Sequence, residues 1–268
     1  MALLVASSGA LLACNAILGV EDVTLKETKK GRSTPDDDGG GDPDPFGDPE
    51  EDGASPRPDR GTLALGFNSG CARLPSGSVK CWGDNGGGQL GDGVPFENPD
   101  RIDQAVQAQP VPNISDAVDI ASGLAHTCVL HKTGRVSCWG VNSFAQLGDG
   151  TTTRSSKPVG VVGLDDAIAI AAGQSFTCAI RQDRSVVCWG ANYSGQLGDD
   201  VPKPGRPDTR PDVQPVKNLA NVVSLTGATD HACAALESGE VMCWGGNASG
   251  QLGIGSTTES LLPVKLSS

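Results

Sequence analysis

The residues of this chain that could do chemistry by themselves are its nine cysteines and three histidines. Eight cysteines form four pairs with the two members ten positions apart, whereas Cys14 stands alone near the start of the chain. Thiols can form disulfides, bind metal or act as nucleophiles. Zinc ligands usually come in closer pairs, and no local histidine pattern accompanies these. We therefore expect disulfides, with reduced buried thiols or a metal site as alternatives, at Cys71–Cys81, Cys128–Cys138, Cys178–Cys188 and Cys233–Cys243.

The segment between the cysteines of each pair predicts a β-hairpin. Alternating stretches flank a three-residue turn, centred on Ser76, Thr133, Asp183 and Ser238. The third loop position favours a left-handed residue, and three of the turns have glycine there. Arg184 takes this place in the third turn, which predicts a hairpin that is strained or shaped differently. In this register the paired cysteines lie directly opposite each other, with Cα atoms roughly 4.5 Å apart, a distance that a disulfide can span.

These hairpins belong to a unit that occurs four times from about residue 61 onward. Each unit continues after the second cysteine with Trp-Gly-x-Asn and then Gln-Leu-Gly, over 71–93, 128–150, 178–200 and 233–255. The tryptophans are 57, 50 and 55 residues apart, at Trp82, Trp139, Trp189 and Trp244. A run of small apolar residues precedes each hairpin, and a Pro-Val strand precedes three of these runs. Four short strands per unit is the count of a β-propeller blade.

The unit Pro-Val followed by VDIASGLAHTCVLHKTGRVSCWGVNSFAQLGDG resembles the repeat of the regulator-of-chromosome-condensation family of β-propellers. The resemblance covers residues 62–268 and implies an all-β propeller of about four blades, whereas known members commonly have seven. The cysteine before each tryptophan stands where many relatives have an aromatic residue. Because the first unit lacks a preceding Pro-Val strand, we expect the terminal segment LLPVKLSS to complete that blade and close the ring; an open arc is the alternative.

The remaining polar candidates favour structural roles. His126 and His231 occupy one repeat position, and Phe176 takes the same place in the third unit, which indicates packing rather than catalysis. His131 lies in a hairpin strand and is expected to face solvent. The aspartates that follow Gln-Leu-Gly could bind calcium, but a turn-forming role is favoured, at Asp92, Asp149 and Asp199. We predict no catalytic residue, no metal site and no cofactor.

The N-terminal part has a different character from the repeats. Residues 2–13 form a short apolar run that ends in Leu-Leu-Ala-Cys14, which resembles the lipobox of bacterial lipoproteins. That resemblance implies a signal segment over 1–14, with Cys14 as lipid anchor. Residues 15–60 are rich in Asp, Glu, Pro and Gly and are predicted to be a disordered tether. Export also favours the disulfides.

Charge and loop lengths complete the functional prediction. The net charge of −12 argues against nucleic acid, which is bound mainly by Lys and Arg. Two connections after Gln-Leu-Gly are longer than the others and offer candidate binding residues: Phe96, Arg101, Lys203, Arg206 and Arg210. We expect a non-enzymatic protein- or glycan-binding module at the bacterial cell envelope, on the outer membrane or cell surface, with membrane contact only through its lipid anchor. A guanine-nucleotide-exchange regulator, implied by the eukaryotic relatives, and a secreted enzyme are the alternatives.

Overall fold

The computed structural model describes residues 62–201 and 209–267. The signal-like segment 1–14, the tether 15–60 and the loop residues Lys203 and Arg206 lie outside the described residues. Gly61–Ser268 form one compact unit. In its described part the regular elements are strands, and no helix there is long and apolar enough to cross a membrane.

Sixteen strands form four antiparallel sheets, each a meander of four strands in chain order. The first sheet contains β1 (Thr62–Leu65), β2 (Ser69–Arg73), β3 (Val79–Asp84) and β4 (Gln104–Pro110). The second contains β5 (Ala117–Ser122), β6 (His126–His131), β7 (Val136–Gly140) and β8 (Ser155–Gly160). The third contains β9 (Ala167–Ala172), β10 (Phe176–Arg181), β11 (Val186–Ala191) and β12 (Thr209–Pro215). The fourth contains β13 (Val222–Gly227), β14 (His231–Leu236), β15 (Val241–Gly245) and β16 (Ser260–Lys265). The predicted all-β fold with four blades is confirmed.

The second and third strands of every sheet form the predicted hairpin. The two cysteines of each pair lie opposite each other in register, with Cα atoms 4.0 to 4.1 Å apart. All four predicted disulfides are present in the structure. Each disulfide therefore staples the two central strands of one blade and crosses to no other blade.

The third hairpin keeps the shape of the others despite its arginine. Arg184 adopts φ +65°, close to the +80° of Gly134 in the second hairpin. Its amide donates to the Arg181 carbonyl at 2.9 Å, as the amide of Gly134 does to His131 at 3.0 Å. The sequence predicted that this hairpin is either strained or differently shaped, and the prediction of a different shape is wrong. A non-glycine residue in this left-handed region costs on the order of 1 kcal/mol, so the difference is one of energy.

The Pro-Val segments do not begin a new blade. Pro110 and Pro215 end β4 and β12, and Pro158 lies in β8, so each segment contributes to the fourth strand of the preceding sheet. In the same way, β16 pairs with β15 of its own sheet. The expectation that LLPVKLSS completes the first blade is therefore wrong. The physical reason is that β16 returns beside the third strand of its own sheet, as β4, β8 and β12 do after connections of different length.

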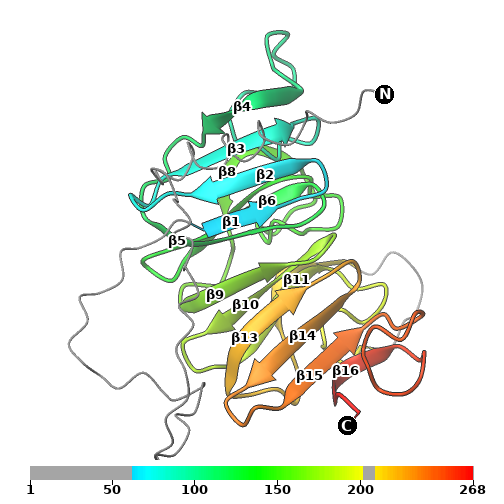
Figure 1. Ribbon diagram of the computed structural model, residues 1–268. Coiled ribbons are helices and arrows are strands. Elements are labelled where there is room, and N and C mark those ends of the chain that lie inside the picture. Colours follow the sequence, from blue (N-terminus) through cyan, green and yellow to red (C-terminus); the bar gives the residue numbers. More distant parts are fainter. Residues whose placement is uncertain (1–61, 202–208, 268) are drawn as a thin grey trace, which may run out of the picture. The chain divides into compact units, whose positions relative to one another are not determined.

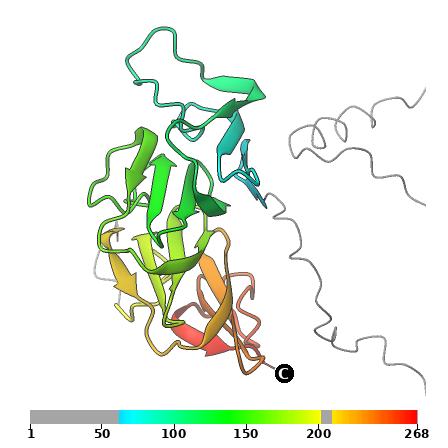
Figure 2. The same cartoon turned by 90° about the vertical axis from the view of Figure 1, so that its left-hand side faces the viewer.

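The sheets pack in a row, which can be followed from the first at the top of Figure 1 to the fourth at the bottom, and again in the turned view of Figure 2. The innermost strands meet in sequence, β1 against β5, β5 against β9 and β9 against β13. Among the described residues no comparable packing returns from the fourth sheet to the first. The alternative of an open arc is therefore the architecture observed.

The apolar core lies between the sheets, because the side chains of a single sheet can be buried only against another sheet. Three clusters fill the three joints, and each combines cysteines of one blade with the tryptophan of the next. Trp139, Trp189 and Trp244 are completely buried in this way. Each blade therefore depends for its core on its immediate neighbours, as in other repeat proteins.

Candidate functional site

The Gln-Leu-Gly turn that recurs in each unit is built around the asparagine of that unit. The Oδ1 atom of Asn142 accepts a hydrogen bond from the Leu147 amide at 2.9 Å, and its Nδ2 atom donates to Asp149 at 3.1 Å. Asn85 and Asn192 make the same pair of contacts in their own blades. The four asparagines, Asn85, Asn142, Asn192 and Asn247, are all buried. They hold the Gln-Leu-Gly turn in place.

This geometry assigns a role to the aspartates that follow the turn. Asp92, Asp149 and Asp199 accept hydrogen bonds from the buried asparagines, which is the turn-forming role that the sequence favoured over calcium. In the fourth unit Ile254 replaces the aspartate, and Asn247 donates to the carbonyls of Ser256 and Thr258, as Asn142 also does to those of Thr151 and Thr153. Within residues 62–201 and 209–267 no three metal-ligating side chains cluster together.

Three exposed apolar side chains lie together where the inner strands end. A hollow of about 240 Å³ is lined by the loops after β1, β5, β9 and β13, one from each blade. We call this hollow and its rim the axial mouth. On it, Phe67 is 76% exposed, Leu65 is 70% exposed and Leu124 is 40% exposed. Leu65 is specific to the first blade, because Ser122, Ala172 and Gly227 take its place in the others.

Backbone hydrogen bonds make the axial mouth rigid. The amide of Phe67 donates to the Leu124 carbonyl, that of Leu124 to Gln174, and that of Gln174 to Ala228, at 3.2, 3.1 and 2.9 Å. Such close approach requires glycine at Gly123, where a Cβ would lie 2.3 Å from the next blade's carbonyl. The apolar side chains are thus presented on a fixed backbone.

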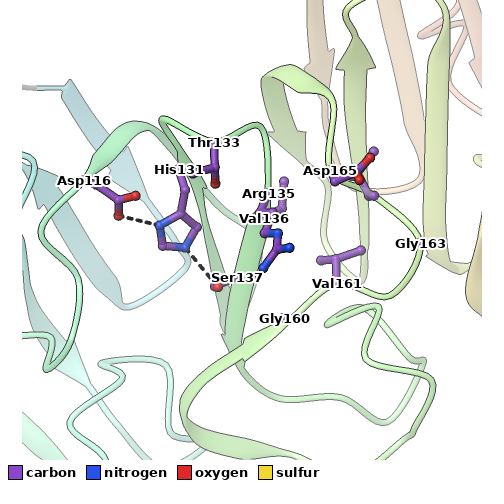
Figure 3. Close-up of a pocket in the computed structure, with 11 residues that line it drawn as sticks. Asp116, His131, Thr133, Arg135, Val136, Ser137, Gly160, Val161, Gly163 and Asp165 are labelled. Carbon is purple, nitrogen blue, oxygen red and sulfur yellow. Dashed lines mark hydrogen bonds and ion pairs between the residues drawn. The ribbon is translucent and has the colours of Figure 1, made fainter.

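A second hollow, of about 610 Å³, lies at the hairpin end of the second blade and reaches the connection from β8 to β9. Figure 3 shows the His131 ring there, between Asp116 and Ser137. The Nδ1 atom of His131 lies 2.6 Å from Asp116 Oδ1, and its Nε2 atom lies 3.0 Å from Ser137 Oγ. The side chain of His131 is only 15% exposed, so the expectation that it faces solvent is wrong. The loop that leads into β5 carries Asp116 over it.

An Asp–His–Ser chain is also the arrangement of the catalytic triad in acyl-transfer enzymes. The third blade has Arg181 where the second has His131, and its Nε atom donates to both Asp166 oxygens at 2.9 and 3.0 Å. Val187 there takes the place of Ser137. The same position therefore ties the hairpin to the loop before the inner strand in both blades. This repetition favours a structural clasp over a catalytic triad.

His126 is the other histidine whose surroundings decide its chemistry. It is buried in the joint between the second and third blades, and its Nε2 atom lies 2.9 Å from Thr177 Oγ1. The Nδ1 atom has no hydrogen-bond partner. Burial lowers the pKa of His126 from 6.5 to about 4, because the charged form would be desolvated. A neutral, packed histidine agrees with the presence of Phe176 at this position in the third blade.

Three of the predicted loop residues, Phe96, Arg101 and Arg210, lie in the described part of the chain. Phe96 and Arg101 lie together in the connection from β3 to β4, where the Arg101 guanidinium carbon is 4.7 Å from the ring centroid. Arg154 of the second blade covers the same ring at 3.8 Å. Arg101 also donates to the Asn85 carbonyl, and its side chain is 6% exposed, so it holds the loop to the blade. Arg210, on β12, lies 3.4 Å from Asp199. A binding role for these residues stays a prediction. The sequence analysis missed the axial mouth, whose only signal was Leu65, at a position where the other blades have smaller residues.

Two family models describe the repeat as "Regulator of chromosome condensation (RCC1) repeat". One matches residues 76–130 and 133–180, and the other matches 117–146, 167–196 and 226–251. Together they cover more than half of the chain. The chain belongs to this family. The matches at 76–130 and 133–180 each run from the third and fourth strands of one blade into the first two strands of the next.

Known proteins with RCC1-like sequences or folds are longer than this chain. The Ultraviolet-B receptor UVR8 of Arabidopsis thaliana is 27% identical over 72% of this chain and 31% of its own length. The rat Probable E3 ubiquitin-protein ligase HERC4 is 33% identical over 32% of this chain and 8% of its own. Among solved structures, yeast RCC1 (Prp20) bound to Kap60 has a TM-score of 0.67 at 23% identity, covering 78% of this chain and 49% of that one. Human WBSCR16 has a TM-score of 0.66 at 21% identity, with 77% and 52% covered. The chain thus spans less than a third of these curated relatives and about half of the solved chains.

The buried His126 predicts a pH-dependent stability. Its folded-state pKa of about 4 lies below the unfolded value of 6.5, so the unfolded chain takes up the proton first as the pH falls. Above pH 6.5 His126 is neutral in both the folded and the unfolded chain, so it does not change the free energy of unfolding with pH. About 3 kcal/mol of unfolding free energy is lost as the pH falls from 6.5 to 4. We expect His126→Phe, which copies the third blade, to lose less stability than the wild type over this range in urea titrations. Equal losses in the two proteins would contradict the assignment.

The clasp interpretation predicts which substitutions at position 131 are tolerated. His131→Arg should keep the free energy of unfolding within about 0.5 kcal/mol, because arginine pairs with aspartate at this place in the third blade. His131→Ala should lower it by about 1 kcal/mol, because the clasp is lost. Urea denaturation of both variants measures the difference. An ester-hydrolysing activity of the wild type that Ser137→Val abolishes would overturn the structural interpretation.

Proposed function

We propose that this protein is a non-enzymatic, protein-binding propeller module whose binding surface is the axial mouth. The observation that carries the proposal is the exposure of Phe67, Leu65 and Leu124 around a hollow on a rigid backbone. Exposed apolar side chains that lie together mark interaction sites, since leaving them in water has a free-energy cost. A buried aromatic anchor is also the usual centre of binding energy in protein interfaces.

Family membership supports a protein partner over a glycan or a nucleic acid. One solved relative is yeast RCC1 (Prp20) in a complex with Kap60, and Prp20p of Saccharomyces cerevisiae has binding properties toward Gsp1p and histones. The net charge of −12 argues against a nucleic-acid partner for this chain, because nucleic acid is bound mainly by Lys and Arg. Glycan binding is the less favoured form of this proposal, and a guanine-nucleotide-exchange regulator and a secreted enzyme stay the alternatives.

For location, we propose that the propeller is exported and held at the bacterial cell envelope by a lipid on Cys14. Two sequence features support this: the apolar run before Cys14, and the eight remaining cysteines being consumed by four disulfides. Disulfides persist in oxidising compartments. The acidic segment 15–60 would then act as a spacer between membrane and propeller.

The binding proposal predicts that polar substitutions at the axial mouth remove the partner. We expect Phe67→Ser and Leu65→Ser to reduce capture of cross-linked envelope proteins about tenfold, because each removes a buried apolar anchor. Quantitative mass spectrometry of cross-linked envelope extracts measures this. Val162→Ser is the matched control, since Val162 is 61% exposed but lies outside the mouth. Equal losses for mouth and control variants would contradict the proposal.

The location proposal predicts the fate of a lipid label. In a bacterial host grown with radioactive palmitate, the wild type should carry label and fractionate with membranes. Cys14→Ser should lose both properties, because the acylated sulfur is absent, while Ser8→Ala should behave as the wild type. Label retained on Cys14→Ser would show that the anchor has been placed wrongly.

A further inference from the structure

The three joints between blades share one contact that seats each blade on the next. The Gln-Leu-Gly turn of one blade lies on the tryptophan of the following blade. Gln89 accepts a hydrogen bond from Trp139 Nε1 at 2.9 Å, and a Cβ on Gly91 would lie 2.7 Å from that same nitrogen. Trp189 and Trp244 donate to Gln146 and Gln196 at 3.0 and 2.9 Å.

The outer strand of the receiving blade forms the other side of this seat. In the first joint, a Cβ on Gly88 would lie 3.0 Å from the Cα atom of Ser156, on β8. In the third joint, Gly195 occupies the same turn position and faces Leu261, on β16. We call the space between the tryptophan and the outer strand the turn socket. Each of the second, third and fourth blades has its socket filled by the preceding blade.

The first blade has a turn socket that nothing in the described residues fills. A hollow of about 580 Å³ lies there, lined by Trp82 and by residues that include Asn68, Asp84 and Val106. Val106 is 95% exposed, whereas Ser156, at the same place in the second blade, is 7% exposed. Trp82 is likewise only partly buried, in contrast to the other three tryptophans.

The inner strand of the first blade shows the same lack of cover. Leu63 lies opposite Ala72, as Ile120 lies opposite Val129 in the second blade. Leu63 is 49% exposed, and Ile120 is 6% exposed. The face of the first blade that carries Trp82 therefore has the residues of an internal joint without the partner.

The fourth blade has the opposite half of the joint. Its turn is preformed, because the Leu252 amide donates to Asn247 Oδ1 at 2.9 Å as in the other units. A Cβ on Gly250 would meet no atom within 4 Å, and one on Gly253 would meet only Leu266. Val241 is half-buried, whereas Val136 and Val186 at its position are 1% exposed.

We propose that two copies of this chain associate through these end faces, with the Gln251–Gly253 turn of each copy seated in the Trp82 socket of the other. The occupant follows from the repeat, because the three internal joints show which surface such a socket accepts. Both halves are present on every copy, so a two-fold arrangement uses each half twice and leaves neither uncovered. Trp82 Nε1 would then donate to the Gln251 carbonyl, as the other tryptophans do within the chain.

A closed pair of these arcs falls within the range of blade numbers of known propellers. Four blades of this chain superpose on about half of the solved propeller chains, at TM-scores of 0.67 and 0.66. Two arcs make a ring of eight blades, at the upper end of the range of known propellers, typically about four to eight. An interface between two different patches closes into a ring when the rotation permits, and extends into a filament when it does not.

The test uses the full chain and two variants, one for each half of the joint. Light scattering coupled to size exclusion should give about twice 27.3 kDa for the wild type. Trp82→Ala should give the monomer mass, because the socket loses its indole. Gly250→Arg should also give the monomer mass, because the long side chain blocks seating of the turn. Ala145 adopts φ +61° at the same position in the second blade, so a Cβ is tolerated there.

Gly239→Arg is the matched control, with the same substitution in the same blade at φ +83°. Arg184 at this position in the third hairpin shows that arginine is accepted, and the control should remain dimeric. Mixing Trp82→Ala with Gly250→Arg should restore a dimer mass, because one intact half remains on each. Circular dichroism of each variant checks that the blades are folded.

A wild-type monomer at the highest soluble concentration would overturn the proposal. So would a dimer that survives both Trp82→Ala and Gly250→Arg in folded protein, since a different surface would then be responsible. A mass that grows without limit as the concentration rises would show an open filament and overturn the closed pair. None of these outcomes depends on whether the axial mouth binds a partner.

Discussion

The contact on which the molecule depends is the seating of a Gln-Leu-Gly turn on the tryptophan of the next blade. A blade is a single sheet and can bury its side chains only against another sheet. The indole is the largest fully buried side chain at each joint, in a chain with only four tryptophans. It also donates to a carbonyl of the turn, as Trp139 does to Gln89. One side chain thus provides both the packing and the specificity of the joint.

The other features of the repeat support this contact in separate ways. The buried asparagine holds the turn in the shape that the tryptophan receives, and the disulfide holds together the two strands that carry it. The axial amide-to-carbonyl bonds from Phe67 to Ala228 set the spacing of the inner strands. Within a blade the links are covalent or local, whereas between blades they are apolar contacts and single hydrogen bonds. Among the described residues, the first and fourth blades each have one face without a neighbouring blade, and positions that are buried elsewhere are exposed there.

Prediction from the sequence succeeded where two residues are linked by a short, regular segment. The cysteine pairs are an example, because a hairpin of fixed loop length leaves one register in which residues ten apart face each other. It failed for the strand in LLPVKLSS, because the same segment can pair with the sheet before it or the sheet after it. It failed also for His131, since Asp116 reaches it from a connecting loop whose path depends on how the first and second blades pack. The clasp could be recognised only by comparing it with Arg181 and Asp166.

The sequence by itself determined the strands, the hairpins, the disulfide pairs and the number of blades, because repetition states the same local preferences four times. Only the tertiary structure decided which strand belongs to which sheet, and that the four sheets form an arc with two unlike ends. It also showed that Phe67, Leu65 and Leu124 share one exposed rim. Exposure of that kind depends on what neighbouring blades cover. Trp82 stands in the same Cys-Trp-Gly-x-Asn motif as Trp139, but among the described residues no turn is seated on it.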